Sequence, residues 1–160
     1  MEQQNETEFL SLIGTYNKII YKICYMYATD DENLKDLYQE TVINLWKGYK
    51  DFIGLSKMSS WIYRVCLNTC ISYYRQDKKH RETLTLSDQH DIEDNNEHAE
   101  QIKELYQLIN RLNKLEKAII LMWLDEKSYE EIAEIIGINR NAVASRIKRI
   151  KEKLSKLSNE

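Results

Sequence analysis

Hydrogen-bond donors are concentrated near the end of the chain, between Ile138 and Leu157. This segment contains seven cations and a single acid, which gives it a charge of +6 in a chain whose net charge is −3. Because helical residues turn by about 100° each, one face of a helix here would be polar. It would carry Asn141, Ser145, Lys148 and Arg149, with Arg140 and Arg146 at its margins. Cations bind phosphates, and amides and hydroxyls bind base edges, so this face predicts binding in the major groove of DNA.

Two helices and a turn must position these side chains. Ser128 is placed to cap the first helix, with Glu131 three residues later as in a capping box. Gly137 stands where that helix must end, and Asn139 can cap the second helix. The second helix has a predicted buried stripe of Val143, Ile147, Ile150, Leu154 and Leu157. This is the layout of a helix-turn-helix, although a basic helix alone also occurs as a solvated member of a bundle.

The composition indicates an almost entirely α-helical protein. Among the 160 residues there are no prolines and only four glycines, and no alternating strand pattern is present. The longest apolar run, 118–124, is far shorter than the ~20 residues of a membrane span. The N-terminus lacks the basic flank and apolar core of a secretion signal. The three cysteines are odd in number and lie inside helical patterns, which fits a reducing compartment. We therefore expect a cytoplasmic protein.

Metal binding and catalysis find little support in the sequence. Cys66 and Cys70 lie one helical turn apart, a spacing that could hold a metal ion. However, His80, His90 and His98 fall in or beside a polar segment and complete no ligand set. We therefore interpret the cysteines as buried apolar residues. There is no phosphate-cradling glycine loop and no nucleophile with an evident base, so no cofactor, small-molecule substrate or enzymatic activity is expected.

Charge divides the chain into two helical domains and an acidic linker. Residues 1–75 have a net charge of −1, residues 76–98 of −4 and residues 99–160 of +2. The middle segment is poor in apolar residues and shows no periodic stripe, which is typical of a solvated linker. We predict an all-α protein with a small domain at 1–79, a linker at 80–98 and the helix-turn-helix domain at 99–160.

The first domain is expected to contain helices at about 6–28, 30–47 and 61–79. The second of these has a regular apolar stripe, and its opposite face is polar except for one isoleucine. That face carries Asp36, Gln39, Glu40, Ile43 and Asn44. It is either a protein-binding surface or a plain solvated face, and its residues alone leave this open.

Aromatic and basic residues mix on the third predicted helix. Its apolar stripe is expected to contain Trp61, Ile62, Val65, Thr69 and Tyr73, and its other sides Tyr63, Arg64, Asn68, Tyr74, Arg75, Lys78 and Lys79. Rings that stack on bases, cations for phosphates and an amide for a base edge are the groups that bind single-stranded nucleic acid. Packing of the aromatic residues in a core is the alternative.

Three segments resemble the sigma factors of bacterial RNA polymerase. The segments DLYQETVINLW (36–46) and WIYRVCLNTCISYYR (61–75) are similar to sigma region 2, and SYEEIAEIIGINRNAVASRIKRIKEKL (128–154) is similar to region 4. Two such domains joined by a short linker resemble the extracytoplasmic-function (ECF) class. The resemblance implies a transcription initiation factor that binds core RNA polymerase and directs it to promoters.

The resemblance also implies roles for individual residues. The face of Asp36, Gln39, Glu40, Ile43 and Asn44 would dock on a coiled coil of the polymerase β′ subunit, and the second domain on the β flap. The third helix, from Trp61, would meet the melted −10 element, with Asn68 in a pocket for a flipped base. The helix from Asn139 would read the −35 element. Family members are commonly held inactive by an anti-sigma factor, which is a further implied partner.

Some positions depart from the family pattern. Ala144 stands in the −35 contact set where many members have Lys or Arg, and Met58 stands near where a Phe often occurs in the base-capturing loop. The Leu-Pro pair that often opens region 4 is Leu112-Asn113, with Asn113 able to cap the helix.

Two other functional classes are compatible with a helix-turn-helix. A stand-alone transcriptional regulator would bind duplex operators without polymerase. A helical adaptor whose basic helix binds acidic proteins would have no salt-dependent affinity for DNA. Neither needs the surface at 36–75.

Overall fold

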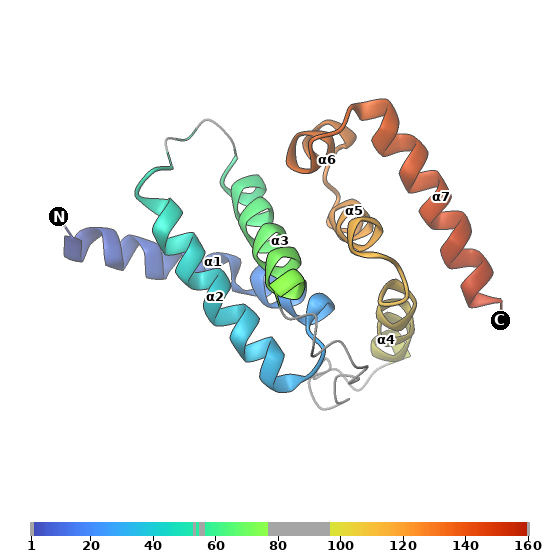
Figure 1. Cartoon of the computed structure of the whole chain (residues 1–160), viewed down its shortest axis with the longest axis horizontal. Helices are drawn as coiled ribbons and strands as arrows, with labels where there is room; N and C mark the ends of the chain where they lie inside the picture. Colours follow the sequence, from blue (N-terminus) through green and yellow to red (C-terminus); the bar gives the residue numbers. More distant parts are fainter. Residues whose placement is uncertain (1, 53, 55–56, 77–96, 160) are drawn as a thin grey trace. The chain divides into compact units, whose positions relative to one another are not determined.

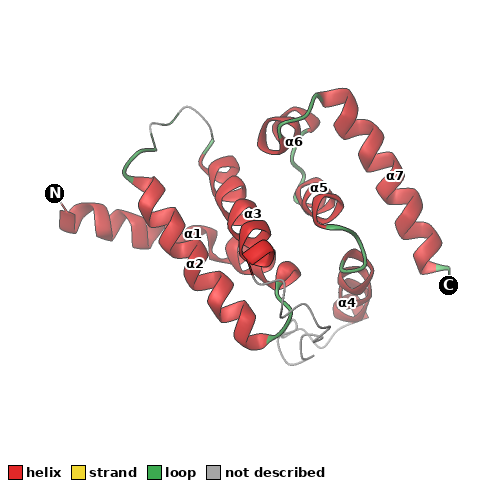
Figure 2. Ribbon diagram, viewed as in Figure 1, coloured by secondary structure: helices red, strands yellow, loops and turns green. Residues whose placement is uncertain are grey.

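The computed structural model describes residues 2–52, 54, 57–76 and 97–159, and these form seven helices without a strand (Figures 1 and 2). The chain divides into two compact units, Met1–Leu86 and Ser87–Glu160. The predicted all-α class is confirmed. The predicted linker, 80–98, lies outside the described residues except for its last two positions, which belong to a helix.

The first unit contains α1 (Glu2–Tyr27), α2 (Asp31–Tyr49) and α3 (Met58–Gln76), and each helix packs against the other two. Asp30 caps α2, since its carboxylate accepts a hydrogen bond of 2.7 Å from the Asn33 N–H. The apolar residues buried in this unit are Phe9, Ile20, Ile23, Cys24, Met26, Tyr27, Ala28, Leu34, Leu37, Leu45, Ile62, Tyr63, Cys66, Leu67 and Cys70. Helix α3 begins at Met58, so Met58 is helical and not part of the preceding loop.

The second unit contains α4 (Glu97–Ile109), α5 (Lys114–Leu124), α6 (Tyr129–Ile136) and α7 (Arg140–Ser158). Asn113 caps α5, as predicted, and it also forms a complete capping box with Glu116, which was not predicted from the sequence. Helix α5 is buried along 117–122, and α6 and α7 both pack against it. The buried helix α5 therefore supports the two helices of the helix-turn-helix.

All three thiols lie in the core of the first unit. Cys24, Cys66 and Cys70 are each 0% exposed, and burial raises the pKa of the Cys66 thiol well above its usual value. Within the described residues no cluster of His, Cys, Asp and Glu is arranged to hold a metal ion. None of the helices described here is long and apolar enough to span a membrane.

Candidate nucleic-acid and protein interfaces

Local side-chain bonds build the turn that presents α7. Ser128 caps α6, since its Oγ accepts from the Glu131 N–H at 3.1 Å. The predicted capping box is only half present, because Glu131 Oε1 accepts from the Ser128 hydroxyl at 3.2 Å and not from its backbone N–H. Gly137 ends α6 at φ 87°, in the left-handed region where a β-carbon would be strained. Asn139 then caps α7 by accepting from the Ala142 N–H at 2.8 Å. The predicted helix-turn-helix geometry is confirmed.

The orientation of α7 leaves most of its predicted DNA face exposed. The core side carries Val143, Ile147 and Ile150, whereas Leu154 and Leu157 are only half-buried, contrary to prediction. The exposed residues of the predicted −35 set are Arg140, Asn141, Ser145, Lys148 and Arg149, and its half-buried residues are Ala144 and Arg146. The donor-rich start of α7 is therefore accessible to a large ligand.

One cation of the basic helix forms an ion pair with an acidic residue of α5. Lys153 Nζ lies 3.0 Å from Glu116 Oε1. Burial raises the pKa of Glu116, but the Asn113 backbone N–H and the Lys153 ammonium together bring it below its ordinary value. Arg146 lines a small cavity of about 120 Å³ together with Asn113, Glu116, Ile119, Arg149 and Ile150. The ion pair of Lys153 and Glu116 therefore links the C-terminal half of α7 to the start of α5.

One predicted nucleic-acid contact of α3 is wrong. Tyr63 was expected on an outward face, but it is 1% exposed and belongs to the core. Helix α3 packs against both α1 and α2, so its buried face is wider than a single stripe. This face contains Ile62, Tyr63, Cys66, Leu67, Thr69 and Cys70. The residues of α3 that pack in the core therefore lie on a different side of the helix from the apolar stripe predicted from Trp61 and Val65.

The remaining residues of that set have different environments. Trp61 is half-buried, with its ring 5.0 Å from that of Phe52. A β-carbon at Gly48 would lie 3.2 Å from Trp61 Cζ2, so the indole packs closely on α2. Asn68 is exposed and Arg64 half-exposed. The side chains of Tyr74 and Arg75, and all of Lys78 and Lys79, lie outside the described residues.

The predicted protein-binding face of α2 is largely exposed. Asp36, Gln39 and Glu40 are exposed, and Ile43 is 45% exposed among them. Asn44 differs, because it is half-buried and its Nδ2 donates to Thr69 Oγ1 at 2.9 Å. The Asn44 amide thus links α2 to α3.

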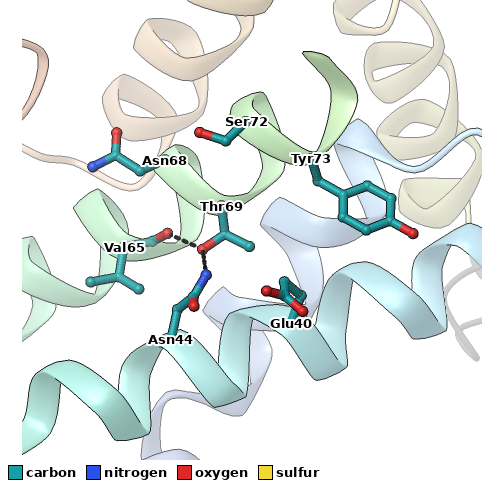
Figure 3. Close-up of a pocket in the computed structure, with 7 residues that line it drawn as sticks. All are labelled: Glu40, Asn44, Val65, Asn68, Thr69, Ser72 and Tyr73. Carbon is teal, nitrogen blue, oxygen red and sulfur yellow. Dashed lines mark hydrogen bonds between the residues drawn. The ribbon is translucent and has the colours of Figure 1, made fainter. Parts of the chain in front are cut away.

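A groove of about 500 Å³ runs between α2 and α3 (Figure 3). It is lined by Glu40, Asn44, Val65, Asn68, Thr69, Ser72 and Tyr73. Figure 3 shows Thr69 turned toward α2, where its hydroxyl accepts from Asn44 and donates to the Val65 carbonyl at 2.7 Å, whereas Asn68 extends away from α2. The sequence pattern does not predict that Ser72 and Tyr73 line a groove with Glu40, because the register of α3 against α2 sets this proximity.

Comparison with known proteins identifies the family. The model described as sigma-70 region 2 matches residues 12–80, and the model described as sigma-70, region 4 matches residues 102–154. RNA polymerase sigma factor YlaC of Bacillus subtilis is 31% identical over 133 residues, which cover 78% of this chain and 77% of the relative. The chain belongs to the ECF class of RNA polymerase sigma factors.

Further relatives agree with this assignment. The ECF sigma factor SigW of B. subtilis is 28% identical over an alignment of 171 positions, covering 98% of this sigma factor and 91% of the relative. The solved structure of the sigma factor RpoE from Bartonella quintana, in complex with the anti-sigma factor NepR, shares the fold. Its TM-score is 0.77 at 19% identity, covering 95% of this chain and 97% of that chain. As a sigma factor, the protein binds RNA polymerase and directs transcription initiation at promoters.

Proposed function

We propose that the sigma factor divides its contacts between its two units. The exposed face of α2 (Asp36, Gln39, Glu40 and Ile43) docks on the coiled coil of the polymerase β′ subunit. This assignment is supported by an exposed isoleucine surrounded by polar side chains, because protein interfaces combine an apolar centre with a polar rim. Asn44 contributes indirectly, by holding α3 against this helix.

The start of α7 binds the −35 element in the major groove. The observation that carries this proposal is the exposed, donor-rich N-terminus of α7, which follows the Gly137 turn. Asn141 and Ser145 lie early on the exposed face and contact base edges, whereas Lys148 and Arg149 contact phosphates. Arg146, which is half-buried, also binds a phosphate at the margin.

The outer side of α3 binds the melted −10 element. Asn68 is exposed there, and its amide can hydrogen-bond a base that has left the stack. Arg64 supplies charge for the neighbouring phosphate, and Lys78 and Lys79 follow on the same chain segment. Tyr63 is excluded from this surface by its burial.

Two further partners are proposed, the β flap of the polymerase and an anti-sigma factor. The second unit also contacts the β flap of polymerase, and an anti-sigma factor binds this protein as NepR binds RpoE. Catalysis belongs to the polymerase, which acts on the chromosome in the cytoplasm. A stand-alone regulator is not favoured, because the region 2 match covers residues 12–80, a surface that such a regulator does not need.

The experiment that tests this division separates polymerase binding from promoter opening. Gln39→Lys adds a positive charge to the proposed docking face. Gln39 does not line the groove to which Asn68 contributes. The Gln39→Lys variant should weaken core polymerase binding by more than tenfold, since mismatched charge at an interface costs roughly several kcal/mol. Asn68→Ala should bind polymerase normally but leave promoter thymines less reactive to permanganate, because the closed complex opens poorly.

A matched control distinguishes docking from a general charge effect. Gln3→Lys adds the same single charge at an exposed position on α1, outside the proposed docking face, and should leave both measurements unchanged. If Gln39→Lys bound polymerase as tightly as the unmodified protein, the docking face on α2 would be wrong. If Asn68→Ala lost polymerase binding, Asn68 would have a structural role and not one in base capture.

A further inference from the structure

Arg140, the first residue of α7, is held by two residues of the preceding helix. Its Nε–H donates to Glu130 Oε1 at 2.6 Å. Its guanidinium carbon also lies 5.4 Å from the centre of the Tyr129 ring, a cation–π contact. Both partners belong to the first turn of α6. Arg140, the first cation of α7, therefore has a defined side-chain orientation in the free protein.

This arrangement contributes little to folding. The side chains of Arg140 and Glu130 are 57% and 66% exposed, and ion pairs at such exposed positions stabilise proteins weakly. The Glu130 backbone N–H and the Arg140 guanidinium lower the pKa of Glu130, so the carboxylate is ionised at neutral pH. Because this ion pair adds little stability, its main effect is to orient the Arg140 side chain.

The chemistry of the pair favours a base edge over a phosphate. A phosphate approaching Arg140 would also approach the Glu130 carboxylate, and the two anions repel. A guanine presents neutral acceptors, N7 and O6, which match the two-pronged geometry of a guanidinium. The Glu130 bond uses Nε–H, so the two terminal amino groups, with four N–H, can form that contact.

We propose that Glu130 and Tyr129 are positioning residues that hold Arg140 to read a guanine in the −35 element. This inference rests on the proposed binding of α7 in the major groove. Arg140 then determines sequence preference at one base pair, and the orientation supplied by α6 makes the contact selective. Positioned side chains give such selectivity because they lose little conformational freedom on binding.

The test measures base preference with the complete holoenzyme. Core polymerase and the full-length chain are assayed for transcription from templates that carry each of the four bases at every −35 position. The variants are Arg140→Ala, Glu130→Ala and Glu130→Gln, which keeps an oxygen that can accept from Nε. Glu134→Ala is the matched control, because Glu134 is an exposed acid on the same helix. Thermal unfolding of each variant checks that the fold is retained.

Arg140→Ala should reduce the preference for guanine at one position by about fivefold or more, since a bidentate contact discriminates by roughly 1–3 kcal/mol. Glu130→Ala should reduce preference at the same position, Glu130→Gln should largely restore it, and Glu134→Ala should leave it unchanged.

If Arg140→Ala weakened transcription from all templates equally, Arg140 would bind a phosphate and the proposal would be overturned. If Glu130→Ala left base preference intact, the positioning role would be overturned while −35 recognition stood. If the unmodified holoenzyme showed no preference at any −35 position, the proposed function itself would fail, and this inference with it.

Discussion

Ile43 is the apolar centre of the α2 face, and its truncation should weaken polymerase binding. The residue is 45% exposed, so nearly half of its surface is available to a partner. Full burial of an isoleucine side chain contributes roughly 1.5–3 kcal/mol, and the exposed 45% therefore corresponds to about 0.7–1.4 kcal/mol. Because about 1.4 kcal/mol is a tenfold change in affinity, Ile43→Ala should raise the Kd for core polymerase about threefold to tenfold.

The assay is titration of the fluorescently labelled chain with core polymerase that lacks sigma factor. Leu10→Ala is the matched control, because Leu10 is an apolar residue of α1 that is 69% exposed, more than Ile43, and lies outside the proposed interface. Circular dichroism verifies that both variants are folded. An unchanged Kd for Ile43→Ala would refute the reasoning, and so would an equal loss in the Leu10→Ala control.

Two further predictions concern the bonds that support these surfaces. A double-mutant cycle of Asn44→Ala and Thr69→Val, measured by urea unfolding, should give a coupling energy of about 1 kcal/mol, because the pair shares one partly buried hydrogen bond. A coupling energy near zero would show that this bond does not link α2 to α3. The lowered pKa of Glu116 means that its ionised form stabilises the folded second unit, so this stability should be present above about pH 4.5 and be lost as pH falls through the folded pKa. Acid titration monitored by unfolding should show a weaker pH dependence in Glu116→Gln than in the unmodified chain, and an identical profile would contradict this role.

Short-range chemistry made much of the second unit predictable. Ser128, Gly137 and Asn139 each act within a few residues of their own position, through a cap or a left-handed turn. Such interactions depend on neighbouring backbone groups, so their residue types and spacing suffice to identify them. The same applies to Asn113, whose capping box at the start of α5 involves Glu116 three residues later.

The side of α3 that faces the core was less predictable. Periodicity places residues on a helix relative to one another, but the neighbouring helices decide how wide the buried face becomes. Tyr63 was assigned to the surface because it lies beside one apolar stripe, yet contacts with both α1 and α2 bury it to 1% exposure. Asn44 was assigned to an outward face, yet the proximity of Thr69 on α3 engages its amide.

The sequence by itself determined the all-helical class, the helix ends around the turn and the polar face of α7, because these depend on composition, on 3.6-residue periodicity and on bonds between near neighbours. Only the tertiary structure decided that Glu130 and Tyr129 hold Arg140, that Glu40 and Asn68 line one groove, and that Tyr63 is core. These facts arise from the packing of one helix on another, which joins residues at separations that no local pattern encodes.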